Sequence, residues 1–379
     1  MKIIDRYVLV NFLKNYLISF MVLIGMYIAL DMVFNFTNLT QTSKDTGQSY
    51  SLFRVMYDIG NFYFYQTFVF FVSLSGIIAV VAAAFTLLRL SRFNEMTAML
   101  AAGTPLLRVA MSIIVAGAVM NLVLLPIDQE LIIPGMIPKL IRSHQDIHEL
   151  TRRSYAVHMM QDASGALFNA ALYTPPTPGV AAHIQYLDVI ERDANYRATR
   201  RIYAASAQWD AAKQRWDLVD GHRVAIDSGN RIGADAVEDA AYYKSDINPE
   251  AIALNVGKDY AQLLSTAKLN QLIAKPKSYG TLSLSRIKNL RFAQPLVNVV
   301  LLLLGISAVL RREPGTIKSS AARCMFLTAL CMGGVFVSYQ LSASPPTPAW
   351  NNTWPALMAW LPIFIFGPLA AYLLDHVKS

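Results

Sequence analysis

Few residues in this chain have types and spacings that could do chemistry, and none forms a recognised catalytic set. His144 and His148 stand four positions apart, which could place two metal ligands on one face of a helix. Because charged and polar residues surround both histidines, we interpret them as solvated side chains rather than as a metal site. Asp188, Glu191 and Asp193 are interpreted as a charged turn at a strand end, not as paired carboxylates for acid–base catalysis.

Motifs that would bind nucleotides or create a nucleophile are missing as well. The sequence has no Walker A segment, no G-x-S-x-G elbow and no H-E-x-x-H helix, so it does not predict P-loop ATP hydrolysis or these hydrolase mechanisms. Its two cysteines, Cys324 and Cys331, lie in an apolar stretch and predict small buried side chains rather than a disulfide or metal ligands. We therefore expect no catalytic residue, no metal and no cofactor, and not an enzyme.

The composition is that of a membrane protein. Of 379 residues, 54% are hydrophobic and only 15% are charged, and the mean hydropathy is +0.36. Such values are typical of chains that cross a bilayer several times. The formal net charge of +8 does not indicate nucleic-acid binding, because many basic residues flank apolar stretches, as the positive-inside rule expects.

A short polar segment, Arg89 to Arg108, could do mechanical rather than catalytic work. The runs on either side of it, residues 59–88 and 109–127, carry no charge. At a rise of ~1.5 Å per residue, each run can cross a hydrocarbon core of ~30 Å. Arg89, Arg92 and Arg108 place the segment on the cytoplasmic side. We predict a small helical loop lying against the membrane.

The residues of this loop allow two interpretations. Glu95 is its only acidic residue, and Met96, Met99 and Leu100 recur at helical spacing to form an apolar face. The helix is predicted to end at Gly103 and the proline two positions later. In one interpretation the apolar face enters a cleft on a partner ATPase and transmits its movement. In the other, the helix is an ordinary amphipathic connector on lipid, and periodicity favours neither.

Six membrane spans are predicted, three on each side of a large insert. They are residues 16–36, a run within 64–88, a run within 109–127, residues 292–310, and two spans that share a charge-free stretch from Cys324 to Leu374. The proline-rich segment Ser342 to Pro355 divides that stretch, because it cannot continue a lipid-exposed helix. Lys and Arg near the span ends predict that both termini are cytoplasmic and that the insert lies on the opposite side.

The insert, about Asp128 to Arg291, is predicted to be a second domain rich in strands. Residues 128–153 read as a polar helix. Short strands with turn signals follow at 166–174, 183–192, 200–210 and 215–226, and the last two are predicted to form a hairpin through Ala211 to Gln214. Strands without intervening helices favour a sandwich, barrel or jelly roll.

Four ionisable residues are candidates for contact with an anionic lipid. Arg286, Lys288 and Arg291 lie just before the fourth span, on the side where few basic residues are expected, and could bind phosphate or carboxylate groups. Asp31 lies in the outer part of the first span, where a charge is costly. The alternatives are basic side chains that reach lipid headgroups and an acidic residue near the interface.

Several segments together resemble the LptF/LptG (YjgP/YjgQ) family, the permease subunits of the lipopolysaccharide-export ABC transporter. They are the opening Ile3 to Lys14, the segment Glu95 to Gly103, which is similar to the family pattern E-x-x-x-M-x-A-x-G, the strand end Trp216 to Gly221, and the start of the fourth span, Arg291 to Leu296. Their order around a strand-rich insert matches the family over nearly the whole chain.

The resemblance implies a fold and a set of partners. The fold would be a polytopic α-helical membrane protein with a first half at 1–127, a periplasmic β-jelly-roll domain at 128–291 and a second half at 292–379. A coupling helix at about 89–105, with Arg92, Glu95, Met96, Met99 and Gly103, would sit on a cytoplasmic ABC ATPase dimer. A second homologous permease would complete a lipid cavity between the first and fifth spans, and related periplasmic β domains would form a bridge.

The chain also departs from the family pattern. Some relatives carry lysines at the outer end of the first span, whereas residues 31–39 here are acidic and aromatic. Arg286, Lys288 and Arg291 could compensate, which leaves the lipid substrate open. The function implied is extraction of lipopolysaccharide or a similar anionic glycolipid from the inner membrane for outer-membrane biogenesis. The alternative is a non-transporting scaffold whose β domain recruits cell-envelope proteins.

Overall fold

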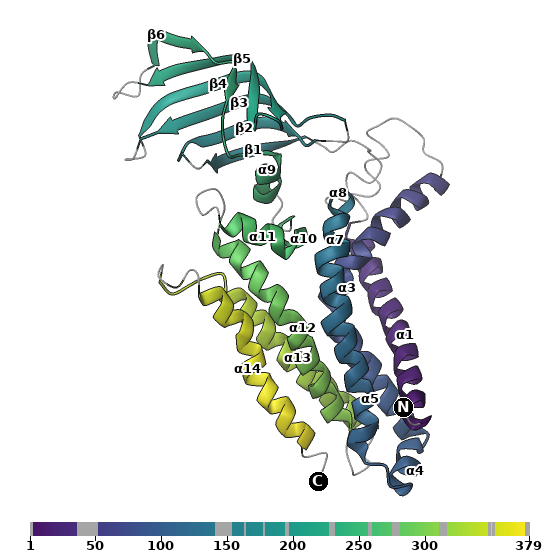
Figure 1. The fold of residues 1–379 in the computed structure, drawn as a ribbon. Coiled ribbons are helices and arrows are strands. Elements are labelled where there is room, and N and C mark those ends of the chain that lie inside the picture. Colours follow the sequence, from purple (N-terminus) through teal and green to yellow (C-terminus); the bar gives the residue numbers. More distant parts are fainter. Residues whose placement is uncertain are drawn as a thin grey trace.

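The protein consists of a bundle of long helices with a β-sheet domain at one end (Figure 1). The computed structural model describes residues 3–35, 52–140, 154–162, 164–176, 179–193, 197–226, 232–256, 260–274, 281–310, 317–347, 350 and 353–375. His144 and His148 lie outside these residues. In the described part, six helices are long and apolar enough to cross a membrane, which confirms the six spans predicted from the sequence.

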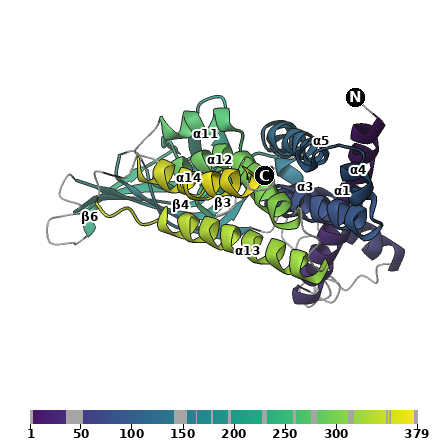
Figure 2. The same ribbon diagram turned by 90° about the horizontal axis from the view of Figure 1, so that it is seen from below.

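The first three spans come before the β domain and the last three after it. They are α1 (Ile3–Phe34), α3 (Leu52–Arg92), a third span from Leu106 to Gly135 that begins with α5 (Leu106–Val119), α12 (Thr281–Val309), α13 (Ile317–Leu341) and α14 (Trp354–Asp375). Seen from below, α1, α3 and α5 group on one side and α12, α13 and α14 on the other (Figure 2). The short helix α4 (Glu95–Ala101) and both marked chain ends lie at the end of the bundle opposite the sheet (Figure 1).

The third span continues past Ile127, where the sequence analysis ended it. It passes through η1 (Met120–Leu124), α6 (Leu125–Ile127), η2 (Asp128–Ile132) and α7 (Ile133–Gly135), and α8 (Ile137–Leu140) follows. The prolines at 126 and 134 each follow a π-helical turn. A proline has no N–H for the carbonyl four residues earlier and clashes with it, and the wider π turn relieves both problems. The helix therefore continues to Gly135, and its polar residues Asp128 and Gln129 are buried in the bundle.

The fourth span also differs from its predicted limits. Its helix, α12, begins at Thr281 rather than at residue 292, so Arg286, Lys288 and Arg291 are helical residues and not part of a loop before the span. From the sequence, the span is predicted to start where the charges end. The structure shows that the helix continues through them, because two short helices of the insert, α10 (Tyr260–Leu263) and α11 (Thr266–Ile273), pack against α12.

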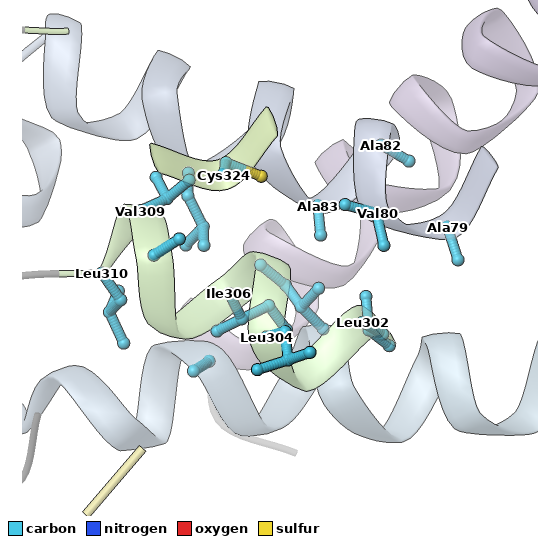
Figure 3. Packing of buried hydrophobic residues seen from close by; sticks show 14 of the residues in the cluster. Ala79, Val80, Ala82, Ala83, Leu302, Leu304, Ile306, Val309, Leu310 and Cys324 are labelled. Atoms are coloured by element: carbon cyan, nitrogen blue, oxygen red, sulfur yellow. The ribbon is translucent and has the colours of Figure 1, made fainter. Parts of the chain in front are cut away.

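The two halves of the bundle share one apolar core. α3 contributes Ala79, Val80, Ala82 and Ala83 to this core, and α12 contributes Leu302, Leu304, Ile306 and Val309 (Figure 3). Small residues allow the helices to approach closely, which is the main source of helix association where lipid removes the hydrophobic driving force. Cys324 and Cys331 are free, buried members of the same core, as predicted.

The β domain is an antiparallel sheet inserted between the third and fourth spans. Its strands are β1 (Tyr155–Gln161), β2 (Leu167–Thr174), β3 (His183–Arg192), β4 (Ala198–Asp210), β5 (Arg215–Ile226), β6 (Ile232–Asp239) and β7 (Tyr242–Tyr243). β1 to β6 pair in chain order and β7 pairs with β5. The sheet is thus a curved meander. The predicted hairpin is present, with Trp209 opposite Trp216.

The insert is not purely β. Helices α9 (Pro249–Val256), α10 (Tyr260–Leu263) and α11 (Thr266–Ile273) follow the sheet and connect it to α12. The buried indole of Trp216 donates to the carbonyl of Ile247 just before α9, over 2.7 Å, and anchors this connection to the sheet core. Helical periodicity in the sequence could not reveal these helices, because each is at most eight residues long.

One buried carboxylate joins the first strand of the domain to its last strand in chain order. Asp162, which follows β1, accepts hydrogen bonds from the N–H groups of Ser164 and Ala166, both over 2.9 Å. It also accepts from the hydroxyl of Tyr243 in β7, over 2.7 Å. Burial, together with Asp162, raises the pKa of Tyr243, so the phenol remains a donor. We call this arrangement the Asp162 clasp.

Candidate functional site

The first candidate site is the turn that carries α4 between α3 and α5. Asn94 precedes the helix in the left-handed conformation (φ 57°), and Gly103 follows it with φ 76°. The N–H of Gly103 bonds to the carbonyl of Leu100 (2.9 Å) and that of Thr104 to the carbonyl of Met99 (3.0 Å). This pattern caps the helix end, and only glycine adopts the Gly103 conformation without strain. The chain therefore turns sharply before and after α4 and so passes from α3 to α5.

Two polar contacts fix this turn to the start of α1. The hydroxyl of Tyr7 donates to Glu95 over 2.9 Å. Arg108, at the start of the third span, forms an ion pair with Asp5 at 3.7 Å. Both contacts are at least partly exposed, so each is worth about 1 kcal/mol or less. Glu95 thus has a partner within its own chain.

The apolar face of α4 points into the bundle. Met96 is only 8% exposed and belongs to the shared apolar core, and Met99 packs against it. One of the two interpretations of the sequence put these methionines in a partner's groove, whereas in the structure they pack α4 against its own spans. The outward side is different: Phe93 is 61% exposed, Leu100 is 37% exposed, and Arg92 is also exposed. Phe93 was missed because it precedes the helix.

The four candidates for lipid contact do not form one cluster. Asp31 accepts a hydrogen bond from the Tyr63 hydroxyl of α3 over 2.9 Å and one from the Asn35 amide over 3.1 Å. Arg286 stacks on the ring of Tyr339 in α13, 4.0 Å from its centroid. Lys288 is half-buried on α12. Asp31 is therefore a contact between the first two spans, whereas the basic residues lie on the fourth.

Arg291 is the most deeply held of these residues. It donates to Glu130 of the third span (3.3 Å) and to the carbonyls of Leu264 (2.6 Å) and Gln262 (2.8 Å). Glu130 also accepts from the N–H of Thr266 over 2.8 Å. This cluster, which we call the Arg291 junction, connects the third span, α12 and the helices of the insert. Its guanidinium is directed to internal acceptors rather than to a headgroup.

Below this junction, polar side chains continue along α12. The amide of Asn298 donates to Ser75 of α3 (2.9 Å) and to Asn121 of the third span (3.0 Å). One turn away, Gln129 donates to Gln294 over 3.1 Å. Buried amides in a membrane must find partners within the protein, so these contacts set the register of the three helices. Sequence alone shows no signal that pairs residues so far apart.

The spans differ greatly in how much surface they leave open. The most apolar stretch of α12 is 67% buried. The corresponding stretches of α1 and α13 are 11% and 17% buried, the lowest values among the six described spans. Large apolar side chains cover the open faces: Leu17, Ile18, Met21 and Val22 on α1, and Met325, Phe326, Phe336 and Val337 on α13. These are the first and fifth spans, and such surfaces suit lipid or another membrane protein.

The three acidic residues of the predicted charged turn have structural partners. Asp188 forms a two-bond contact with Arg201 (2.8 and 3.0 Å) that raises the pKa of the guanidinium. Glu191 pairs with Arg200 at 3.8 Å, and Asp193 accepts from the N–H of Arg197 over 2.8 Å. Glu191 and Asp193 therefore lie at the predicted charged strand end, whereas Asp188 lies inside β3. Among the described residues, no group of three or more His, Cys, Asp or Glu side chains could hold a metal ion.

Comparison with known families agrees with this architecture. Residues 6–376 match the model of the lipopolysaccharide export system permease LptF/LptG. No curated protein matches the chain at a significant level. The match covers all six spans and the inserted sheet. The chain therefore belongs to the LptF/LptG family of lipopolysaccharide export permeases.

Proposed function

We propose that this chain is one permease subunit of an ABC transporter that extracts lipopolysaccharide, or a similar anionic glycolipid, from the inner membrane. A separate ATPase would supply the energy, and the β domain would pass the lipid to periplasmic bridge proteins of related fold. The family match supports the export role. The observation that carries the coupling role is α4, a short capped helix between two spans with an exposed outer side.

The charge distribution supports the orientation that this function needs. Arg89, Arg92 and Arg108 lie at the α4 end of the bundle, opposite the sheet. The positive-inside rule puts that end, with both termini, in the cytoplasm and the β domain in the periplasm. An ATPase dimer would then meet Arg92 and Phe93, while Met96 and Met99 pass its movement to the bundle core. Gly103 fixes the angle between α4 and the third span.

The open faces of α1 and α13 support a lipid cavity shared with a second permease. Their exposed apolar side chains could hold acyl chains, and each buried CH₂ contributes about 0.8 kcal/mol. Extraction of several chains therefore opposes many kcal/mol and needs an external energy source. Arg286 and Lys288 are the basic residues at the β-domain end of α12 that could contact phosphate groups. Asp31 would act indirectly, by holding α1 against α3.

Two substitutions separate a docking role of Glu95 from an internal one. Glu95→Gln removes the charge but keeps an oxygen that accepts from Tyr7, whereas Tyr7→Phe removes only that hydrogen bond. We expect Glu95→Gln to reduce lipid release from proteoliposomes about tenfold, equal to ~1.4 kcal/mol. Tyr7→Phe should stay within about twofold of the parent chain. Equal effects of both substitutions would show that Glu95 acts only within the bundle.

Co-purification tests the docking surface itself. Ala98→Arg adds a bulky charge to the exposed side of α4, and Met96→Leu conserves its buried side. With the ATPase co-expressed, the first variant should lose the ATPase in mild detergent and the second should retain it. Retention by both variants would contradict docking through α4. Recovery of cell-envelope proteins without any ATPase, even from the parent chain, would favour the scaffold.

A further inference from the structure

The third span holds a carboxylate that the proposed transport function does not use. Asp128 is the first residue of the π-helical turn η2 and is 3% exposed. Neither of its carboxylate oxygens has a hydrogen-bond partner among the described residues. Buried polar groups in proteins almost always have partners, and ionisable groups inside membrane spans are rare and usually functional. Asp128 therefore needs an explanation.

The polar groups near this position are engaged with one another. On the adjacent residue, Gln129 donates to Gln294 of α12, and Gln294 donates to the carbonyl of Val72 in α3 over 2.6 Å. The amide of Asn298 is used by Ser75 and Asn121. The side-chain amides of Gln129, Gln294 and Asn298 are thus directed to acceptors other than Asp128.

Two cations at this end of the bundle, Arg291 and Lys139, are bonded to other acceptors. Arg291 of α12 binds Glu130 and two carbonyls at the Arg291 junction. Lys139 of α8 donates to the Tyr65 hydroxyl of α3 over 2.6 Å. The other tyrosine on this part of α3, Tyr63, donates to Asp31. An ionised Asp128 would therefore be a buried anion with no counter-ion among the described side chains.

The energetic cost of a buried anion without a counter-ion decides whether the Asp128 carboxyl is ionised or neutral. An isolated carboxylate in a low-dielectric interior is strongly disfavoured, and such a group becomes neutral instead. A neutral carboxyl loses the charge and gains an O–H donor, which can bond to a backbone carbonyl. The π-helical turn that starts at Asp128 shifts the backbone hydrogen-bond ladder, and such turns often occur at functional sites.

We propose that Asp128 is a proton-binding site inside the bundle, where a neutral carboxyl is held while the third span packs against α3 and α12. The carboxyl releases its proton when these helices separate and water reaches it. Packing at the β-domain end of the bundle is thereby linked to proton uptake. This inference does not depend on which lipid is exported or on whether α4 binds an ATPase.

Infrared spectroscopy tests the proposal directly. The full chain is labelled with ¹³C at the aspartate side-chain carboxyls and placed in lipid nanodiscs at pH 7, where the carbonyl stretching band of a neutral carboxyl is distinct from the carboxylate bands. We expect one neutral aspartate band in the parent chain and its loss in Asp128→Asn. In Asp128→Glu, the neutral band should move to the unlabelled region, because glutamate carries no label.

A matched control and the opposite outcome complete the test. Asp188→Asn removes a carboxylate that is paired with Arg201 in the β domain, so it should leave the neutral band unchanged. A parent spectrum without any neutral aspartate band at pH 7 would overturn the proposal. So would a neutral band that persists in Asp128→Asn, because another aspartate would then carry the proton. The parent spectrum alone shows whether a neutral aspartate is present, even where a variant folds poorly.

Discussion

Helices α12 and α1 are both apolar spans, yet the structure uses them in opposite ways. α12 is 67% buried over its most apolar window and carries Arg291, Gln294 and Asn298, each bonded to another element. α1 is 11% buried over its window and presents residues such as Met21 to its surroundings. In lipid, apolarity alone does not bring helices together, so close packing and polar contacts must do so. α12 is therefore the buried centre of the bundle, whereas α1 lies at its edge and leaves most of its apolar surface open.

The largest loss of stability should come from breaking the Arg291 junction, which holds α12. Glu130→Leu leaves the guanidinium of Arg291, whose side chain is 7% exposed, without its counter-ion. We expect a loss of about 3 kcal/mol in the free energy of unfolding, because an uncompensated buried charge is strongly unfavourable. The double variant Glu130→Leu/Arg291→Leu should recover part of that loss. Unfolding in mixed micelles measures the stability of both variants, and a double variant no more stable than Glu130→Leu alone would contradict charge pairing.

A leucine on each helix gives a smaller contrast. Leu302 of α12 is fully buried, and Leu302→Ala should cost about 2 kcal/mol, since the cavity removes packing contacts that lipid cannot replace. Leu17 of α1 is 58% exposed, and Leu17→Ala should change the stability by less than about 0.5 kcal/mol. The same unfolding assay applies. Equal losses at the two sites would mean that α1 is packed as firmly as α12.

A glycine on each helix should give the smallest effects, with opposite signs. A Cβ at Gly305 of α12 would lie 2.7 Å from a methyl carbon of Val80, so Gly305→Ala should destabilise the bundle by about 1 kcal/mol. No atom lies within 4 Å of a Cβ at Gly25 of α1. Gly25→Ala should therefore stabilise the helix by roughly 0.5 kcal/mol. Thermal unfolding of both variants in one detergent shows whether each is more or less stable than the parent chain. A lower stability of Gly25→Ala would contradict the open space around Gly25.

What could be predicted from the sequence follows from local patterns. Strands β3 and β5 have the predicted limits, because alternating side chains and turn residues determine them locally. The six spans are confirmed for a similar reason, since length and apolarity are sufficient to recognise a span. The ends of the third and fourth spans were misplaced at Asp128 and Arg291. Charge was taken as the end of the membrane segment, whereas these residues are buried against other helices.

Contacts between distant parts of the chain could not be predicted. Glu130 and Arg291 are 161 positions apart, and nothing in either local sequence indicates the other. The sequence predicts an apolar side of α4 but leaves open what it contacts, and in the structure Met96 and Met99 pack against the protein's own spans. A stripe that contains Met96 and Met99 has the same pattern whether it packs on another protein or on its own spans. Only the three-dimensional arrangement distinguishes the two cases.

The Asp162 clasp determines how the β domain would carry a mechanical load. The chain enters the sheet at β1 and leaves it after β7 through α9, which lies beside β1 (Figure 1). A pulling force that reaches both connections from the moving helices can pass through the bond between Asp162 and Tyr243. The strands from β2 to β6 lie outside this short path. They can therefore keep their shape while the helices beneath them move.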